Sequence, residues 1–341
     1  MKKNLIWIIL GLLFIIGGVY WWQNKENKAE DEVIKIGVLA PLTGNSAAIG
    51  DWFKKGIEFA IEKNPKTKGV KIIFEDTKND AKTAVAAYNN LKRQNVNAIF
   101  STMSGTSFPI KPLAIKDNIP LFVTSVSNPD FPDGKTIFRY NTKTKDEIES
   151  IKEHFKQNNV KALNFLYIND EYGIEALTLM KEICPDIKLS EFPFEKNQTD
   201  FKNIIAKLPR ENKDYIIGYG GAYITALKSV IEITKPDTIY SIYGLDFKEF
   251  KSPILNTGVI AGYTKPKISN KATYDQFVSD YEKRFNVQPN MVNIFSYDLI
   301  NFMINYLHKD KEVIKSAYGF ELISDPNGEI NIPIEFVYEK L

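Results

Sequence analysis

The sequence is poor in the residues that build most catalytic and metal sites. Its 341 residues include one cysteine and two histidines. The single Cys184 excludes an intramolecular disulfide and a thiolate metal cluster, so we expect a buried, inert thiol. His154 and His308 lie far apart in segments of helical pattern. We therefore expect both on helix surfaces rather than in a catalytic site.

A basic excess is also missing. Lys and Arg number 44 and Asp and Glu 42, which leaves a net charge of +2. Because nucleic-acid-binding domains usually carry a basic face, we expect no nucleic-acid partner. The sequence contains no Gly-x-Ser-x-Gly elbow, Walker loop or His-Glu-x-x-His motif, and "GYGG" at 218–221 lacks the spacing of a dinucleotide site. We expect neither an enzyme nor a bound cofactor or metal.

One long apolar run is present, from Leu5 to Trp22, and it follows Lys2 and Lys3. Its length suits a bilayer span, and the lysines would stay in the cytoplasm. No small-x-small cleavage site follows the run closely, and no cysteine is available for lipid attachment. We therefore expect residues 5–22 to be an uncleaved membrane anchor in preference to a cleaved secretion signal, with a solvated linker up to residue 32.

After the linker, short apolar runs alternate with amphipathic segments. Ile148, Ile151 and Phe155, for example, share one face of a predicted helix. Strands that alternate with helices indicate a mainly parallel sheet covered on both faces. The number of units exceeds one sheet, so we expect two α/β lobes. The predicted strands are 33–40, 70–76, 97–102, 119–125, 161–168, 187–194, 214–220, 238–244 and 258–264.

The segments that follow the first, third and fourth predicted strands are rich in Ser, Thr and Gly. They are "PLTGNSAAIG" (41–50), "STMSGTSFP" (101–109) and "TSVSNPD" (124–130). Ligands of open α/β sheets bind at the carboxyl ends of the strands. Short hydroxyl side chains and helix-start N–H groups there suit an anion such as a carboxylate. Each segment alone also fits simple helix capping, but three together favour a shared cleft.

The second half of the chain places aromatic and acidic residues after its strands. Tyr172 follows one predicted strand, Tyr219 and Tyr223 flank a glycine pair, and Asp246 follows another strand. This set suits a small zwitterion, with its ammonium on Asp246 and tyrosines closing over it. Core packing is the alternative for each tyrosine, and an N-cap is the alternative for Asp246.

In these residues the sequence resembles the type I periplasmic solute-binding proteins, the leucine/isoleucine/valine-binding family of ABC importers. The resemblance runs in order through nearly everything after the linker. It is carried by "IKIGVLAPLTGNSAAIGDWFKKGIEFAIE", "FEDTKNDAKTAVAAYNNL", "STMSGTS", "IPLFVTSVSNP", "IFRYN", "YINDEYG", "GYGGAY", "YGLDF", "FSYDLINFMINYL" and "SDPNGEINIPIEFVYE".

The resemblance implies two Rossmann-like lobes that are joined by three crossovers and close on a ligand like a hinged clamp. Residues 33–140 and 265–325 would form the first lobe. Residues 141–264 and 326–341 would form the second lobe. Arg139 in "IFRYN" could meet an anion, but we prefer a structural role near the first crossover, because the family pattern has an arginine there.

The resemblance also assigns ligand contacts. Ser104 and Ser127 would hold the ligand carboxylate, with backbone contacts from Ser125 beside them. Tyr172 and Asp246 would approach from the second lobe, Asp246 as the partner of the ammonium group. The full set of expected contacts is Ile49, Ser104, Ser125, Ser127, Tyr172, Tyr223 and Asp246.

Three features depart from the family pattern. Ile49 stands where binders of branched amino acids often carry an aromatic residue, the segment 307–322 is short, and the lipid-attachment cysteine is missing. Two functions remain open. The first is an extracytoplasmic binding protein that delivers an amino-acid-like solute to an ABC permease. The second is a membrane-tethered ligand-sensing domain that signals through a partner protein.

Overall fold

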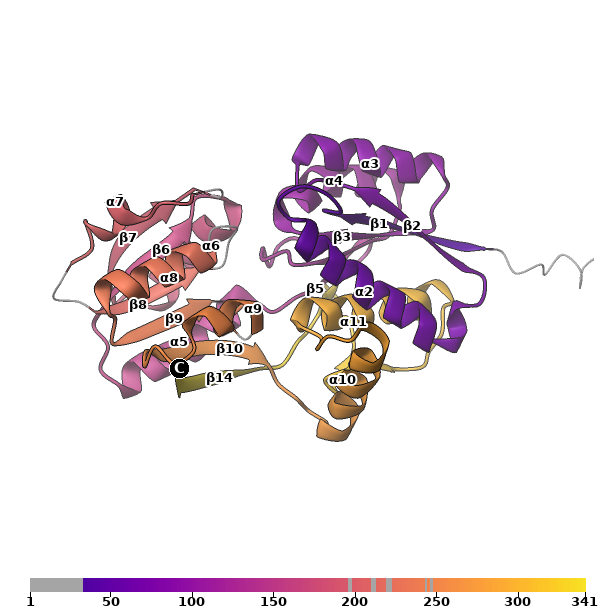
Figure 1. Cartoon of the computed structure of the whole chain (residues 1–341). Coiled ribbons are helices and arrows are strands. Elements are labelled where there is room, and N and C mark those ends of the chain that lie inside the picture. The colour runs from indigo at the N-terminus through magenta and orange to yellow at the C-terminus, as the bar shows by residue number, and fades with distance from the viewer. Residues whose placement is uncertain (1–32, 196–197, 210–212, 219–222, 243, 246–247) are drawn as a thin grey trace, which may run out of the picture.

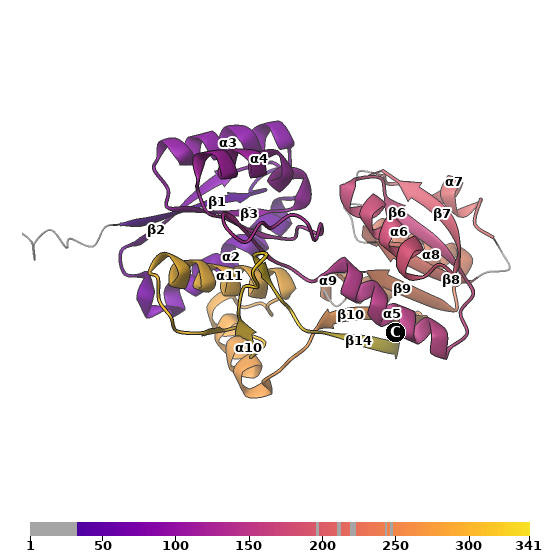
Figure 2. The same ribbon diagram turned by 180° about the vertical axis from the view of Figure 1, so that it is seen from behind.

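The chain forms two α/β lobes that lie side by side (Figure 1). The computed structural model describes residues 33–341 except 196–197, 210–212, 219–222, 243 and 246–247. Seen from behind, the same two bodies are joined by thin connecting segments (Figure 2). The predicted two-lobe α/β architecture is therefore confirmed.

The first lobe is built on a six-stranded parallel sheet of order β13-β5-β4-β3-β1-β2. Its strands are β1 (Ile34–Ala40), β2 (Val70–Asp76), β3 (Ala98–Thr102), β4 (Leu121–Thr124), β5 (Ile137–Tyr140) and β13 (Glu329–Ile330). Its helices are α2 (Ala47–Lys63), α3 (Ala81–Arg93), α4 (Ser104–Asp117), α10 (Lys271–Phe285) and α11 (Met291–Leu307).

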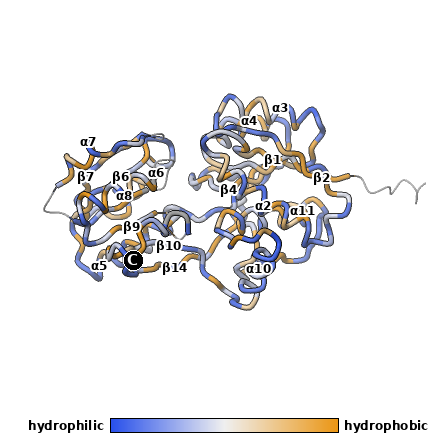
Figure 3. Tube along the Cα trace, viewed as in Figure 1, coloured by the Kyte–Doolittle hydropathy of each residue, from blue (hydrophilic) through white to orange (hydrophobic). Residues whose placement is uncertain are grey.

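Helices cover both faces of this sheet. Along β1, Ile36 and Val38 pack into the core beneath α2 and α11, whereas Leu39 packs into the core beneath α3 and α4. This division follows from the alternation of side chains along a strand. A strand buried on both faces reads as a continuous apolar run, and Figure 3 shows hydrophobic residues gathered along the strands.

The second lobe repeats the plan with the sheet order β14-β10-β9-β8-β6-β7. Its pairs are parallel except that of β10 with the edge strand β14. Its strands are β6 (Ala162–Ile168), β7 (Lys188–Phe194), β8 (Asp214–Gly218), β9 (Thr238–Ile242), β10 (Ile260–Pro266) and β14 (Ile334–Lys340). Its helices are α5 (Thr144–Gln157), α6 (Glu171–Ile183), α7 (Lys202–Ile205), α8 (Tyr223–Thr234) and α9 (Lys248–Lys251).

The chain passes between the two sheets three times, after β5, after β10 and after β13. The last passage falls later than the boundary at residue 326 that the sequence suggested. Two residues of β13 pair with Arg139 and Tyr140 of β5, so this strand belongs to the first sheet. A short hairpin of β11 (Ile314–Lys315) and β12 (Glu321–Leu322) precedes it.

All nine strands predicted from apolar runs are confirmed within a few residues. The helix α2 begins at Ala47. Gly50 lies within the helix and against the preceding loop, where an added Cβ would approach the carbonyl oxygen of Pro41 to 2.0 Å. The glycine therefore serves close packing rather than helix initiation.

The predicted anchor at residues 5–22 lies outside the described residues. Within the part of the chain that is described, no helix combines the length and the apolar character needed to cross a membrane.

Candidate functional site

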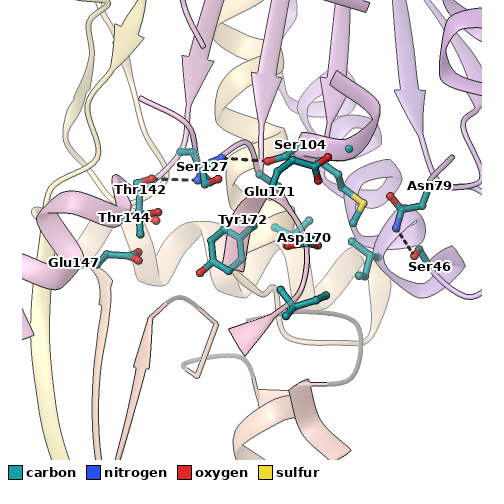
Figure 4. Close-up of a pocket in the computed structure, with 17 residues that line it drawn as sticks. Ser46, Asn79, Ser104, Ser127, Thr142, Thr144, Glu147, Asp170, Glu171 and Tyr172 are labelled. Atoms are coloured by element: carbon teal, nitrogen blue, oxygen red, sulfur yellow. Dashed lines mark hydrogen bonds between the residues drawn. The ribbon is translucent and has the colours of Figure 1, made fainter. Parts of the chain in front are cut away.

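A cleft between the two lobes encloses about 1140 Å³ of empty space, open solvent included. It lies at the carboxyl ends of the parallel strands, and residues of both lobes line it (Figure 4). The lining residues are Ser46, Ile49, Asn79, Met103, Ser104, Gly105, Ser125, Ser127, Asn141, Thr142, Thr144, Glu147, Ile168, Asp170, Glu171, Tyr172 and Val292.

The loops after β3 and β4 form the first-lobe wall. Ser104 opens α4, and its hydroxyl accepts a hydrogen bond from the backbone N–H of Ser127 at 3.4 Å. Met103 and Ser125 both have positive φ angles, 68° and 55°. Residues other than glycine rarely adopt this conformation, and such residues cluster at ligand sites. The start of α4 thus faces the cleft with helix N–H groups suited to an anion.

Ser127 connects the two lobes directly. Its hydroxyl donates a hydrogen bond to the Oε2 atom of Glu175 on α6, at 2.8 Å. Burial raises the pKa of the Glu175 carboxyl, while the hydrogen bond from Ser127 and the charge of Arg139 oppose that shift. The hydroxyl that we expected to hold a ligand carboxylate therefore holds a carboxylate of the protein itself.

Arg139 supports this wall from beneath the surface. It is fully buried, its Nε pairs with the Oε2 atom of Glu329 at 2.9 Å, and its Nη1 donates to the carbonyls of Val126 and Ser127. The arginine does not line the cleft. The structure thus agrees with the structural role that we preferred for Arg139.

The loop between β1 and α2 is fixed by Asp76 at the end of β2. The Asp76 carboxylate accepts hydrogen bonds from the backbone N–H of Leu42, at 2.8 Å, and from the Thr43 hydroxyl. Burial raises the pKa of Asp76, but these hydrogen bonds hold it below its usual value. The fixed loop leads into the first turn of α2, where Ser46 and Ile49 line the cleft.

The second-lobe wall is the start of α6. Asp170 caps this helix by accepting a hydrogen bond from the backbone N–H of Gly173, at 3.1 Å. Tyr172 projects into the cleft, and its hydroxyl donates to the carbonyl of Ile242 at 3.2 Å. Gly173 allows α6 to approach β6, because an added Cβ would come within 1.9 Å of the Ile168 carbonyl oxygen.

The first crossover forms the back of the cleft, where Asn141, Thr142 and Glu147 are all buried. Asn141 Nδ2 donates to the Thr142 carbonyl at 3.1 Å. Asn141 Oδ1 and Thr142 Oγ1 have no hydrogen-bond partner among the described residues. Buried polar atoms rarely stay unpaired, so these two mark a place that a bound molecule can satisfy.

The structure brings five of the seven expected ligand contacts together in this cleft: Ile49, Ser104, Ser125, Ser127 and Tyr172. Asp246 lies outside the described residues, and so does the side chain of Tyr223, the first residue of α8. Sequence reasoning missed the crossover residues Asn141 to Glu147, since they follow a strand that carries a buried arginine. Asn79 was also missed, although it stands in the Asp-rich turn "FEDTKND".

The residues that the structure describes contain no group of three or more His, Cys, Asp or Glu side chains that could hold a metal ion. His154 packs against Tyr338, with ring centroids 4.2 Å apart, away from the cleft lining. Cys184 is buried, as expected, and burial raises its pKa.

Comparisons with known proteins agree with this architecture. The Leu/Ile/Val-binding protein homolog 2 of Brucella abortus is 24% identical over 202 residues, which cover 56% of this chain and 54% of that protein. The match thus spans about half the length of this curated relative.

Solved structures match over a larger share of the chain. The branched-chain amino acid transporter substrate binding protein LivJ of Streptococcus pneumoniae, solved with isoleucine, has a TM-score of 0.78 at 16% identity. It covers 91% of this chain and 99% of its own. A solute binding protein of an ABC transporter from Rhodopseudomonas palustris, solved with 3,4-dihydroxybenzoic acid, has a TM-score of 0.77 at 17% identity. It covers 90% of this chain and 93% of its own.

These likenesses establish the fold, and a family model establishes the membership. The family model that is described as periplasmic binding protein matches residues 33–332. This range covers most of the chain and nearly all of the residues that the structure describes. Members of this family are substrate-binding proteins rather than enzymes, and the family implies an extracytoplasmic location. The chain therefore belongs to the periplasmic binding protein family.

Proposed function

We propose that this protein captures a small amino-acid-like solute between its two lobes for uptake through an ABC permease. The observation that carries the proposal is the cleft itself, which residues of both lobes line at the carboxyl ends of the parallel strands. A site divided between two hinged bodies can enclose its ligand when the lobes close.

The proposed contacts use the chemistry at the start of α4. Ser104 and the first N–H groups of α4 hold the ligand carboxylate, with backbone contacts from Ser125. Ser127 is a further donor when its bond to Glu175 opens. Tyr172 covers the ligand from the second lobe. Asp246 and Tyr223 complete the site in this proposal, Asp246 as the ammonium partner.

Uptake is favoured over sensing. The similar solved structures include substrate-binding proteins of ABC transporters, and several curated relatives are named for Leu/Ile/Val binding.

We further propose that residues 5–22 anchor the protein to the cytoplasmic membrane, so that the lobes work beside the permease. The support is the apolar run after Lys2 and Lys3 and the missing cleavage site. N-terminal sequencing of the mature protein tests this proposal. Protein that starts near Ala29 and is released from the membrane fraction would contradict it.

A thermal-shift screen of amino acids, amides, amines and carboxylates against the full chain tests the binding function. A ligand at 100 times its Kd stabilises the folded state by about 2.7 kcal/mol. We expect Ser104→Ala to weaken binding of a carboxylate-bearing ligand about tenfold, because a hydroxyl at the helix start is lost. Ser269→Ala removes an exposed hydroxyl outside the cleft and serves as the control. If Ser104→Ala binds as the wild type does, the carboxylate assignment is wrong.

A further inference from the structure

The charges that line the cleft narrow the class of ligand. We propose that the cleft selects a small amine with a net positive charge, such as a basic amino acid or a diamine, rather than a neutral branched amino acid or an aromatic acid. This inference rests on the proposed solute-binding function.

Acidic side chains dominate the charge of the cleft lining. Glu147, Asp170 and Glu171 bring three carboxylates to the lining, and no Lys, Arg or His among the described residues lines it. Figure 4 shows Glu147 and Asp170 on the second-lobe side of the cleft, opposite the hydroxyls of Ser104 and Ser127. A cleft lined by one sign of charge attracts ligands of the opposite sign.

The first crossover offers the cleft an unpaired hydrogen-bond acceptor. Asn141 is only 5% exposed, and its Oδ1 atom has no donor among the described residues. Its Nδ2 already donates to the Thr142 carbonyl, so the atom left over is an acceptor. Glu147 lies on the same wall, within the first turn of α5. An N–H group of a ligand satisfies the Asn141 Oδ1 acceptor, whereas an ionised carboxylate has no hydrogen to donate to it.

The first-lobe wall, where an anion would bind, already holds a carboxylate of the protein. The Ser127 hydroxyl already donates a hydrogen bond to Glu175, so a ligand anion beside Ser127 would meet the Glu175 carboxylate. Arg139 is a buried cation beneath this wall, but Glu329 neutralises it in an ion pair of 2.9 Å. The start of α4, with Ser104, suits a ligand carboxylate, but three carboxylates of the protein line the same cleft.

The inference is tested by calorimetric titration of the purified full chain with six probes. L-arginine, L-ornithine and putrescine carry a net positive charge, L-leucine and L-glutamate do not, and benzoate is an aromatic acid. We expect at least one cation to bind at least tenfold tighter than the other three probes, with an affinity that falls as salt rises. Comparing the amino acids with putrescine shows whether the ligand carboxylate contributes.

Variants locate the effect. Glu147→Gln and Glu171→Gln keep the size of the side chain and remove its charge. Each is expected to weaken the best cation about tenfold. Glu149→Gln is the matched control, since Glu149 lies on α5, is exposed and does not line the cleft. Glu171 is exposed, so its variant keeps the test valid if Glu147→Gln fails to fold.

The outcomes separate the inference from the function beneath it. Tighter binding of leucine, glutamate or benzoate overturns the inference and leaves solute binding intact. Unchanged cation affinity in both glutamine variants also overturns the inference. If no solute binds in this titration or in the broader thermal-shift screen, the proposed function falls together with the inference.

Discussion

Arg139 joins three segments of the first lobe through one buried guanidinium group. It pairs with Glu329 on β13 and donates to two carbonyls in the loop after β4. An ion pair in this position contributes little net stability by itself, because both charges must leave water. Removing only one partner is costly, since the other charge stays buried and unpaired.

We therefore expect Arg139→Met to lower the free energy of unfolding by about 3–5 kcal/mol. Urea denaturation of the variant and the wild type measures the loss. Arg284→Met is the control, because Arg284 pairs with Glu62 on the surface and such pairs contribute about 1 kcal/mol or less. Similar losses in the two variants would show that the buried position of Arg139 is unimportant.

Asp298 is a buried acid with three donors around it. Its carboxylate accepts hydrogen bonds from the Tyr140 hydroxyl at 2.7 Å, the Ser316 hydroxyl at 2.6 Å and the Ala317 backbone N–H at 2.8 Å. Burial raises the pKa of Asp298 to about 6, and these hydrogen bonds limit the rise. The group ties α11 to β5 and to the loop before β12.

The raised pKa predicts a pH dependence of stability. The pKa of Asp298 is 3.8 in the unfolded chain and about 6 in the folded state. Between these two pH values, Asp298 is protonated in the folded state and ionised in the unfolded chain. The stabilisation of the folded state by this bound proton is complete below the unfolded pKa and is lost as pH rises through the folded pKa. We expect wild type to lose roughly 2–3 kcal/mol relative to Asp298→Asn between pH 4 and pH 7. Denaturation at a series of pH values measures this difference, and parallel curves would contradict it.

Two helices that begin at the cleft each carry a glycine in the first turn. One glycine is tightly packed and the other faces open space. At Gly173 in α6 an added Cβ would meet the backbone of Ile168 at 1.9 Å, whereas at Gly105 in α4 it would meet nothing within 4 Å. The first glycine sets the distance between a helix and its strand. The second leaves space open in the cleft.

Alanine at the two positions should therefore act differently. Gly173→Ala pushes α6 away from β6, and we expect a loss of about 2 kcal/mol or more together with weaker ligand binding, because Tyr172 moves. Gly105→Ala should fold with unchanged or slightly higher stability, since alanine favours a helix by up to about 1 kcal/mol. Thermal denaturation and titration with the best ligand compare the two. Equal losses of stability would contradict the assigned packing.

At the scale of the whole molecule, the hydrogen bond between Ser127 and Glu175 links the two lobes across the cleft. The helices α4 and α6 also contact each other there. A hydrogen bond to a charged group contributes about 1.5–3 kcal/mol, which is enough to move an equilibrium between open and closed forms about tenfold or more.

We expect Glu175→Ala to open the unliganded protein, seen as a larger radius of gyration in small-angle X-ray scattering. Glu175→Gln should stay compact, because the amide oxygen still accepts the Ser127 hydrogen bond. Glu182→Ala, an exposed change on the same helix, is the control. Identical scattering from all three variants would show that this contact does not hold the lobes together.

The sequence predicts this architecture because buried parallel strands are continuous apolar runs. It fails at β5, whose segment "IFRY" contains a charged residue, and at β13, which has only two residues. The same limit applies to the site. Of the residues that line the cleft, Ser104, Ser125, Ser127 and Tyr172 follow predicted strands and were expected there. Asn141 and Glu147 follow β5 and were not. The bond between Ser127 and Glu175 depends on how two lobes meet, which no local pattern encodes.

The third passage between the lobes has a consequence for how the protein is made. A chain that emerges from the ribosome appears N-terminus first, but the edge strand of the first sheet begins only at Glu329 of 341 residues. Until then Arg139 lacks its acidic partner, 190 positions away. The first sheet is thus completed only after every strand of the second sheet except β14 has been made.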